Sequence, residues 1–256
     1  MRERYGARDE RSLRMRFHTQ TAGVSLTAQQ PEVNLVRTAI EALAGVLGGT
    51  QSLHTNSMDE TLALPTEKAA RLALRTQQVI AYETRVANVA DPLGGSWYVE
   101  ALTDDLERAA EVVFAHLDQL GDGSMREGAL RAVESGWFMR EIADSAYDLE
   151  RKLNAGKHLV VGVNVALEGN DDAPPEILRI GPEVEETQLK RLETVKHDRN
   201  VDAVDAALDD VRAVAAEPTV NVMPALLHAV NVYATIGEIS NALADVFGRF
   251  TETPSV

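Results

Sequence analysis

Apolar and polar residues alternate strictly near the start of the chain. The apolar set is Leu13, Met15, Phe17 and Thr19, and the polar set is Arg14, Arg16, His18 and Gln20. Side chains of a β-strand point alternately to opposite faces, so this pattern predicts a strand over 13–19. Its apolar face is suited to pack on helices. Its polar face presents charge and hydrogen-bonding groups.

A helix and a second strand are predicted directly after this strand. Apolar residues recur at helical spacing after Pro31, at Leu35, Val36, Ala39, Ile40, Leu43, Val46 and Leu47, and Gly48-Gly49 ends the helix. Residues 50–56 form the next predicted strand and its exit, and Thr66 is the candidate N-cap of a helix ending near Glu83. The order strand, helix, strand, helix is typical of a parallel α/β fold. The polar strand face favours a closed barrel, whose strand ends open on a central site.

The rest of the chain is predicted to be mainly helical. We expect a short extended piece at 97–99, a helix over 103–120, helices over 125–134 and 138–154, and a buried parallel strand over 158–164. The stripe expected to be buried in the helix over 103–120 is Leu106, Ala109, Ala110, Val113 and Leu117. A linker over 168–182 precedes helices over 183–198, 201–217 and 222–249, the last interrupted near Gly237. The expected division is therefore 1–167 and 168–256.

Composition excludes several classes of protein. The 256 residues suffice for one or two domains with a sizeable core. Cysteine is absent, which excludes disulfides, thiolate metal sites and a thiol nucleophile. The net charge of −15 argues against a nucleic-acid partner. No apolar run approaches the roughly 20 residues of a membrane span, and no secretory signal is recognisable. We expect a cytoplasmic protein without a membrane partner.

Five sequence motifs point to one family, and the first two are long and lie at matched spacing. They are FHTQTAGVSLTAQQP (17–31), GGTQSLHTNSMDETLALPTE (48–67), RTQQVIAYE (75–83), DPLGGSWYVE (91–100) and VVGVN (160–164). Together they resemble the acyl-CoA mutases that use adenosylcobalamin, among which methylmalonyl-CoA mutase is the best known. The resemblance covers nearly the whole chain. It implies the second half of a (β/α)8 TIM-type barrel, followed by a mainly helical C-terminal segment, and a radical 1,2 rearrangement of an acyl-CoA.

The resemblance also implies roles for seven residues. Those expected to face the acyl-CoA substrate are His18, Gln20, Gln51, Ser52 and His54, and those expected to face the adenosyl group are Asn56 and Glu60. It assigns no catalytic residue. Without the resemblance, His18 and Gln20 also fit a polar network inside a barrel, and Glu60 fits a carboxylate that pairs with a helix dipole.

The amino-terminal arginines allow two interpretations. Residues 1–16 hold six of them, Arg2, Arg4, Arg8, Arg11, Arg14 and Arg16, against Glu3, Asp9 and Glu10. They form either a cradle for an anionic ligand such as the phosphates of coenzyme A, or a solvated helix end and loop.

Two features of the family are missing from this sequence. The Asp-x-His-x-x-Gly motif that supplies the lower axial histidine to cobalamin does not occur, so we expect adenosylcobalamin to be bound mainly by another domain or chain. Only three barrel strands are predicted, whereas a (β/α)8 barrel has eight. We therefore expect the N-terminal half of the barrel as a second partner. The histidines show no spacing typical of a zinc site.

Three functions remain open at this point. In the first, the chain is part of the substrate-binding large subunit of a mutase that converts methylmalonyl-CoA to succinyl-CoA or catalyses a similar isomerisation. In that case we expect the isolated chain to be inactive. The second is a catalytically inactive mutase-like chain that acts in interaction or regulation. The third, an unrelated α/β-barrel lyase or hydrolase, would require a metal cluster or nucleophile that the sequence does not offer.

Overall fold

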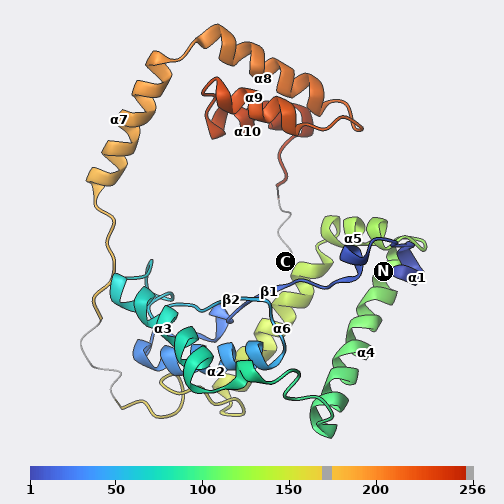
Figure 1. The fold of residues 1–256 in the computed structure, drawn as a ribbon, viewed down its shortest axis with the longest axis vertical. Coiled ribbons are helices and arrows are strands. Elements are labelled where there is room, and N and C mark those ends of the chain that lie inside the picture. Colours follow the sequence, from blue (N-terminus) through green and yellow to red (C-terminus); the bar gives the residue numbers. More distant parts are fainter. Residues whose placement is uncertain (169–174, 252–256) are drawn as a thin grey trace. The chain divides into compact units, whose positions relative to one another are not determined.

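The structure, a computed structural model, describes residues 1–168 and 175–251. These residues form two compact units, the first spanning Met1–Arg179 and the second beginning at Ile180. Figure 1 shows the helices and strands of both units.

The first unit is mainly helical and contains one small sheet. Its strands are β1 (His18–Gln20) and β2 (Ser52–His54), and its α-helices are α1 (Arg2–Tyr5), α2 (Asn34–Leu47), α3 (Glu67–Glu83), α4 (Trp97–Leu120), α5 (Met125–Glu134) and α6 (Trp137–Asn154). Short 3₁₀ helices lie at Glu10–Leu13, Gly23–Ser25, Pro31–Val33 and Val86–Asn88. The predicted cap of α3 is confirmed, because the Thr66 hydroxyl accepts a hydrogen bond from the Ala69 N–H at 3.2 Å.

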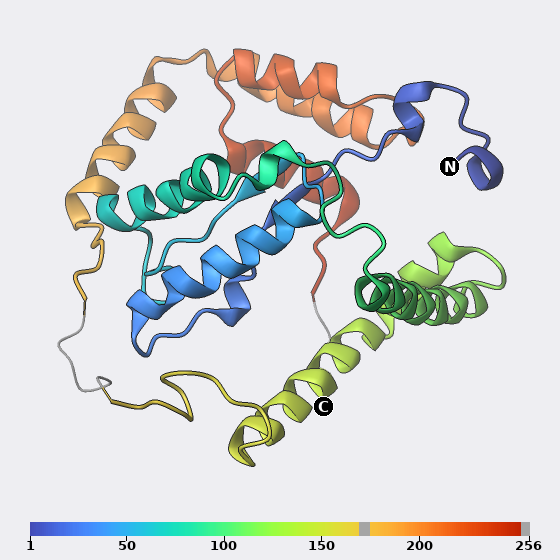
Figure 2. The same ribbon diagram turned by 60° about the horizontal axis from the view of Figure 1, so that its bottom comes forward.

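The two strands pair in parallel, and α2 connects them. His18 pairs with Ser52, Thr19 with Leu53, and Gln20 with His54. One face of the pair is covered by α2, where a Cβ added at Gly45 would lie 3.2 Å from the Thr19 methyl carbon. Figure 2 shows α2 and α3 side by side next to the strands. The predicted strand–helix–strand unit is confirmed, whereas a barrel would need strands beyond the two that pair in the described residues.

The first strand is shorter than predicted. Residues 10–13 form a 3₁₀ turn instead, and the Asp9 carboxylate stabilises its start by accepting the Arg11 N–H at 2.8 Å. Such a local side-chain bond competes with an extended backbone. Met15 is 81% exposed. The strand therefore exists only where β2 supplies backbone partners.

The predicted buried strand over 158–164 is wrong. This segment is a turn with one isolated bridge between Val161 and Val165. The Asn164 side chain accepts the Val160 N–H at 2.7 Å and donates to the carbonyls of Leu153 and His158. These local bonds occupy backbone groups that a strand would use.

The apolar faces of two helices are less buried than their periodicity suggests. In α2, the buried residues are Asn34, Thr38 and Ala42, while Val36 and Ile40 are exposed. In α4, only Leu117 of the predicted stripe is buried. The predicted extended piece at 97–99 is the first turn of α4. Periodicity identifies an apolar face, but its burial requires a second surface.

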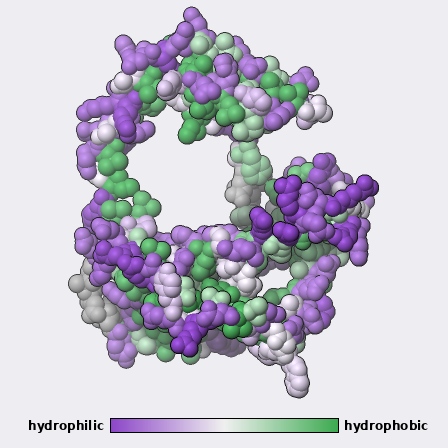
Figure 3. All heavy atoms as spheres, in the orientation of Figure 1, coloured by the Kyte–Doolittle hydropathy of each residue, from purple (hydrophilic) through white to green (hydrophobic). Residues whose placement is uncertain are grey.

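Apolar side chains consequently reach the surface in both units, as the green areas of Figure 3 show. In the first unit they include Val36, Ile40 and Leu106, and in the second Met223 and Leu227. No helix within the described ranges has both the length and the apolar character to cross a membrane.

The described residues of the second unit form helices joined by short loops. Its helices are α7 (Pro182–Asp198), α8 (Val201–Ala215), α9 (Met223–Asn231) and α10 (Ile236–Phe247). Its core consists of Val204, Ala207, Leu208, Val211, Ala225, Ala229 and Ala242. The predicted interruption lies at 232–235, because Thr235 starts α10 with a capping box to Glu238, and Gly237 is inside the helix.

A largely buried ion pair joins the start of α8 to the start of α10. Both terminal nitrogens of Arg199 donate to the Glu238 carboxylate, at 2.6 and 2.7 Å, and one also donates to the Tyr233 carbonyl. The Arg199 side chain is 9% exposed. Arg199 lowers the pKa of Glu238 to about 2, from an ordinary 4.5, with a smaller contribution from Thr235.

From this ion pair we predict that acid lowers the stability of the second unit. Because the pKa of Glu238 is lowered by folding, its stabilisation is present above pH ~4.5 and is lost as pH falls towards ~2. We expect Glu238→Gln to lower the free energy of unfolding by ~1–3 kcal/mol at pH 7. The variant and the wild type should approach each other in stability at acid pH. Chemical denaturation followed at several pH values checks this, and a constant difference down to the acid limit would contradict it.

Candidate functional site

Four predicted site residues lie on one face of the strand pair. Directly paired residues of parallel strands point to the same side, so His18 lies beside Ser52 and Gln20 lies beside His54. All four are exposed, whereas Thr19 and Leu53 on the opposite face are partly buried against α2. We call this set, His18, Gln20, Ser52 and His54, the polar face.

Hydrogen bonds link neighbouring side chains within and beyond the polar face. The Nδ1 atom of His18 is hydrogen bonded to the Ser52 hydroxyl. The Gln20 amide donates to Asn56 Oδ1 at 3.1 Å. The structure therefore brings His18 and Ser52 together, and connects Gln20 to the loop that follows β2.

Hydrogen bonds connect the residues that follow the two strands. Asn56 is almost completely buried, and its side chain donates to the Thr21 carbonyl at 3.1 Å. Its backbone N–H donates to the Thr21 hydroxyl at 3.0 Å. The Thr21 N–H in turn donates to the His54 carbonyl at 3.1 Å. Asn56 therefore has a structural role at the carboxyl ends of the strands, and a ligand could bind its buried amide only by replacing one of these hydrogen bonds.

Gly23 allows Asn56 and Glu60 to approach the loop that follows β1. A Cβ at this glycine would lie 3.2 Å from Asn56 Nδ2 and 3.4 Å from Glu60 Oε1. The loop itself is held by α2, because the Glu41 carboxylate accepts the Ala22 N–H at 2.8 Å and the Ser25 hydroxyl at 2.5 Å. The two residues predicted to face an adenosyl group, Asn56 and Glu60, thus both lie next to Gly23, and Glu60 is exposed there.

Gln51 is separated from the polar face. Its side-chain oxygen Oε1 accepts a hydrogen bond from the Phe17 N–H at 2.8 Å, and its side-chain nitrogen Nε2 donates to the Gly49 carbonyl at 3.1 Å. Both contacts lie at the amino-terminal end of the strands. In this arrangement Gln51 fixes the start of β1 and does not converge with His18.

Sequence reasoning missed Asp59, which is buried within the second motif. Its Oδ2 accepts the N–H and the hydroxyl of Thr66, at 2.9 and 3.0 Å. Asn34 of α2 adds a bond from its amide to the Met58 carbonyl at 2.9 Å. These contacts hold the loop that carries Asn56 and Glu60 against α2 and α3. Asp59 lies seven residues before Thr66, too far for a local capping pattern to indicate its role.

The donor set fits part of a nucleoside-bearing cofactor but no metal ion. In the described ranges, no group of three or more histidine or acidic residues could hold a metal. An exposed carboxylate beside an amide, as at Glu60 and Asn56, can accept hydrogen bonds from ribose hydroxyls. Such residues suit the adenosyl part of adenosylcobalamin, and the corrin ring would require other surfaces.

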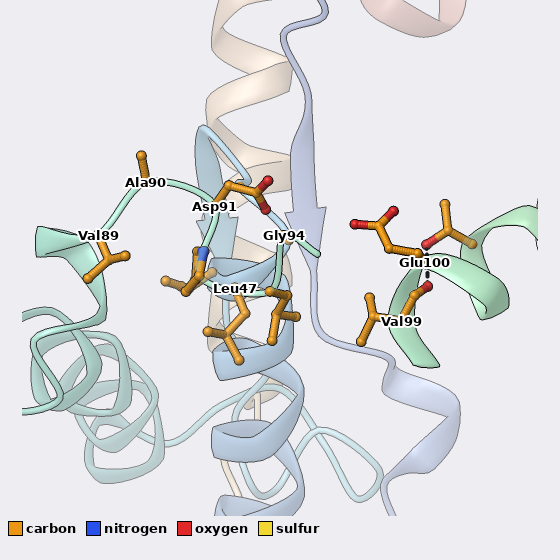
Figure 4. Close-up of a pocket in the computed structure, with 13 residues that line it drawn as sticks. Leu47, Val89, Ala90, Asp91, Gly94, Val99 and Glu100 are labelled. Carbon is orange, nitrogen blue, oxygen red and sulfur yellow. Dashed lines mark hydrogen bonds between the residues drawn. The ribbon is translucent and has the colours of Figure 1, made fainter. Parts of the chain in front are cut away.

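A separate cleft of about 580 Å³ lies near the end of α2 (Figure 4). Its wall includes Leu47, Val89, Asp91, Gly94 and Glu100. The Glu100 carboxylate accepts the Gly95 N–H at 3.0 Å. Because α2 ends where β2 begins, this cleft is near the amino ends of the strands, whereas ligands of parallel α/β folds bind at the carboxyl ends. It is therefore distinct from the polar face.

Comparison with known proteins gives consistent results. A family profile described as methylmalonyl-CoA mutase matches residues 1–249. The 2-hydroxyisobutanoyl-CoA mutase large subunit of Aquincola tertiaricarbonis is 44% identical over 254 residues, which cover 99% of this chain and 44% of that subunit. The methylmalonyl-CoA mutase of Escherichia coli is 40% identical over 246 residues, covering 96% of this chain and 34% of that enzyme. The mitochondrial methylmalonyl-CoA mutase of Mus musculus is 39% identical over 244 residues, covering 94% and 32%.

The chain thus spans less than half the length of these relatives. The profile match nevertheless extends over both units described above, and the quoted motifs lie within it. From this extent of similarity we conclude that the chain belongs to the methylmalonyl-CoA mutase family.

Proposed function

We propose that this chain supplies part of the substrate-binding large subunit of an adenosylcobalamin-dependent acyl-CoA mutase, an isomerase that rearranges a carbon skeleton. The observation that supports this most is the polar face, where four exposed side chains adjoin a loop carrying Asn56 and Glu60. The names of the relatives support an acyl-CoA substrate. Either methylmalonyl-CoA or a similar branched acyl-CoA is consistent with them.

His18 and Gln20 would bind the thioester end of the substrate. An amide or a neutral imidazole donates a hydrogen bond to a carbonyl oxygen while holding its own proton firmly. Such donors orient the acyl group without acting as acids. In this proposal Ser52 and His54 extend the same surface. Gln51, which bonds to Phe17, would act indirectly by fixing the start of β1.

Asn56 and Glu60 would hold the adenosyl group through its ribose hydroxyls. When bound, adenosylcobalamin would supply the radical chemistry of the rearrangement. The chain's own residues bind, orient and exclude water. Gly23 matters because it leaves room for Glu60 and Asn56 at the strand exits.

The proposal requires two partners. Among the described residues, no further strand pairs with either outer edge of the two strands, and such open edges pair with further strands. We assign these positions to the N-terminal half of the barrel. The cobalamin would be bound mainly by another domain or subunit, and the amino-terminal arginines offer charge to the phosphates of coenzyme A. A cytoplasmic location stays a prediction.

The exposed apolar faces favour a second candidate function. Val36, Ile40 and Leu106 are open in the first unit. Such faces also suit a mutase-like chain that has lost catalysis and serves in interaction or regulation. Turnover by the assembled protein separates the two functions.

One prediction of this proposal concerns catalytic activity. The isolated chain with added adenosylcobalamin should not isomerise methylmalonyl-CoA or 2-hydroxyisobutanoyl-CoA, because its sequence has no axial-histidine motif and its described residues form two paired strands of the eight that a barrel needs. Co-expression with the N-terminal barrel half of a mutase large subunit and with a cobalamin-binding domain or subunit should produce turnover, measured by chromatography of the acyl-CoA products. Activity of the isolated chain would contradict the assignment of partners. A stable, cofactor-loaded assembly without activity would favour the interaction function.

Another prediction of this proposal concerns the affinity for the cofactor. In that assembly, Glu60→Ala should weaken adenosylcobalamin binding ~10- to 100-fold, since a hydrogen bond to a charged group is worth ~1.5–3 kcal/mol. Acyl-CoA affinity should remain unchanged. Glu67→Ala is the matched control, because Glu67 is 93% exposed in the first turn of α3. Absorbance titration measures the cofactor affinity. Equal losses for both variants, or none for Glu60→Ala, would exclude the proposed role.

A further inference from the structure

The hydrogen bond between His18 and Ser52 has a chemical consequence for the polar face. We propose that Ser52 is a positioning residue whose hydroxyl donates to His18 Nδ1 and thereby keeps the ring proton on Nε2. The function of this arrangement rests on the acyl-CoA site proposed above. The hydrogen bond between His18 and Ser52 is present whether or not that proposal holds.

The backbone holds the two side chains next to each other. His18 and Ser52 are directly paired in the parallel ladder, so their Cβ atoms leave the sheet on the same side. The position of Ser52 is fixed further by Thr50, whose hydroxyl donates to the Ser52 carbonyl at 2.8 Å. Thr50 also accepts the Thr19 hydroxyl at 2.8 Å. The contact between His18 and Ser52 is therefore built into the strand register.

We assign the direction of the bond from the proton of the hydroxyl and from the preferred tautomer of neutral imidazole. A serine hydroxyl carries one donor, and the His18 contact is the only hydrogen bond of the Ser52 hydroxyl among the described residues. Neutral imidazole in a peptide prefers the tautomer with its proton on Nε2, which leaves Nδ1 as an acceptor. The hydroxyl satisfies that acceptor. Both groups then have a partner without a change of tautomer.

The consequence is a defined donor on the polar face. With Nδ1 occupied by Ser52, the Nε2–H of His18 is the ring's remaining polar group, and it can donate to a thioester carbonyl oxygen. In the other tautomer, Nε2 would present a lone pair that repels this oxygen. Ser52 therefore stabilises the tautomer in which His18 offers a donor to the substrate.

His54 provides an internal comparison. It lies on the same face, two residues after Ser52, and is exposed like His18. In the described residues its ring has no hydrogen bond to another group. Its two tautomers should interconvert freely, whereas those of His18 should not.

The test uses the full chain labelled with ¹⁵N and long-range proton–nitrogen correlation spectra at a pH where the imidazoles are neutral. The chain has six histidines, and His18→Gln and His54→Gln variants assign the two signals. We expect one fixed Nε2–H tautomer for His18 in the wild type. Ser52→Ala should shift the His18 nitrogens towards the averaged values of His54. Ser52→Thr, which keeps the hydroxyl, should restore the wild-type pattern.

Three results would overturn the proposal: an Nδ1–H tautomer of His18 in the wild type, an unchanged His18 signal in Ser52→Ala, or equal shifts of His18 and His54 in that variant. In the assembled enzyme, Ser52→Ala should lower kcat ~10-fold, the equivalent of one hydrogen bond, and Ser52→Thr should recover it. If the wild-type assembly is inactive, the proposed mutase function fails, while the spectra still decide the role of Ser52.

Discussion

The parallel pairing of β1 with β2 is the constraint on which the candidate site depends. Its register places His18 beside Ser52 and Gln20 beside His54, and it turns Thr19 and Leu53 towards α2. A shift by one residue would reverse these faces and remove the polar groups from the site. The loops after both strands depend on the same pairing, because Thr21 and Asn56 join them only when the strands end together.

The strand–helix–strand unit could be predicted because short-range patterns determine it. Alternation defined the faces at His18 and Gln20, glycines ended α2, and Thr66 capped α3. Burial was less predictable. Val36 and Ile40 follow helical periodicity yet are exposed, since a face is buried only where another surface meets it. Over 158–164, the side chain of Asn164 redirected backbone hydrogen bonds that the apolar pattern had assigned to a strand.

The candidate site was predictable in composition and only partly in geometry. Motifs indicated the residues, and the strand register explains why four of them share a face. Gln51 departs from that set because its amide bonds to backbone at the other end of β1. Asp59 was missed because its role depends on Thr66, seven residues later, and on the burial of both. Such contacts depend on tertiary packing, which sequence patterns alone do not report.

The most direct measurement is a structure of the assembled enzyme with an acyl-CoA and adenosylcobalamin bound. The account predicts the thioester carbonyl within hydrogen-bonding distance of His18 Nε2 or the Gln20 amide, and ribose hydroxyls at Glu60. It also predicts further strands paired to the free edges of β1 and β2. Substrate bound in the cleft beside Val89 and Gly94, with the polar face covered by protein, would contradict it.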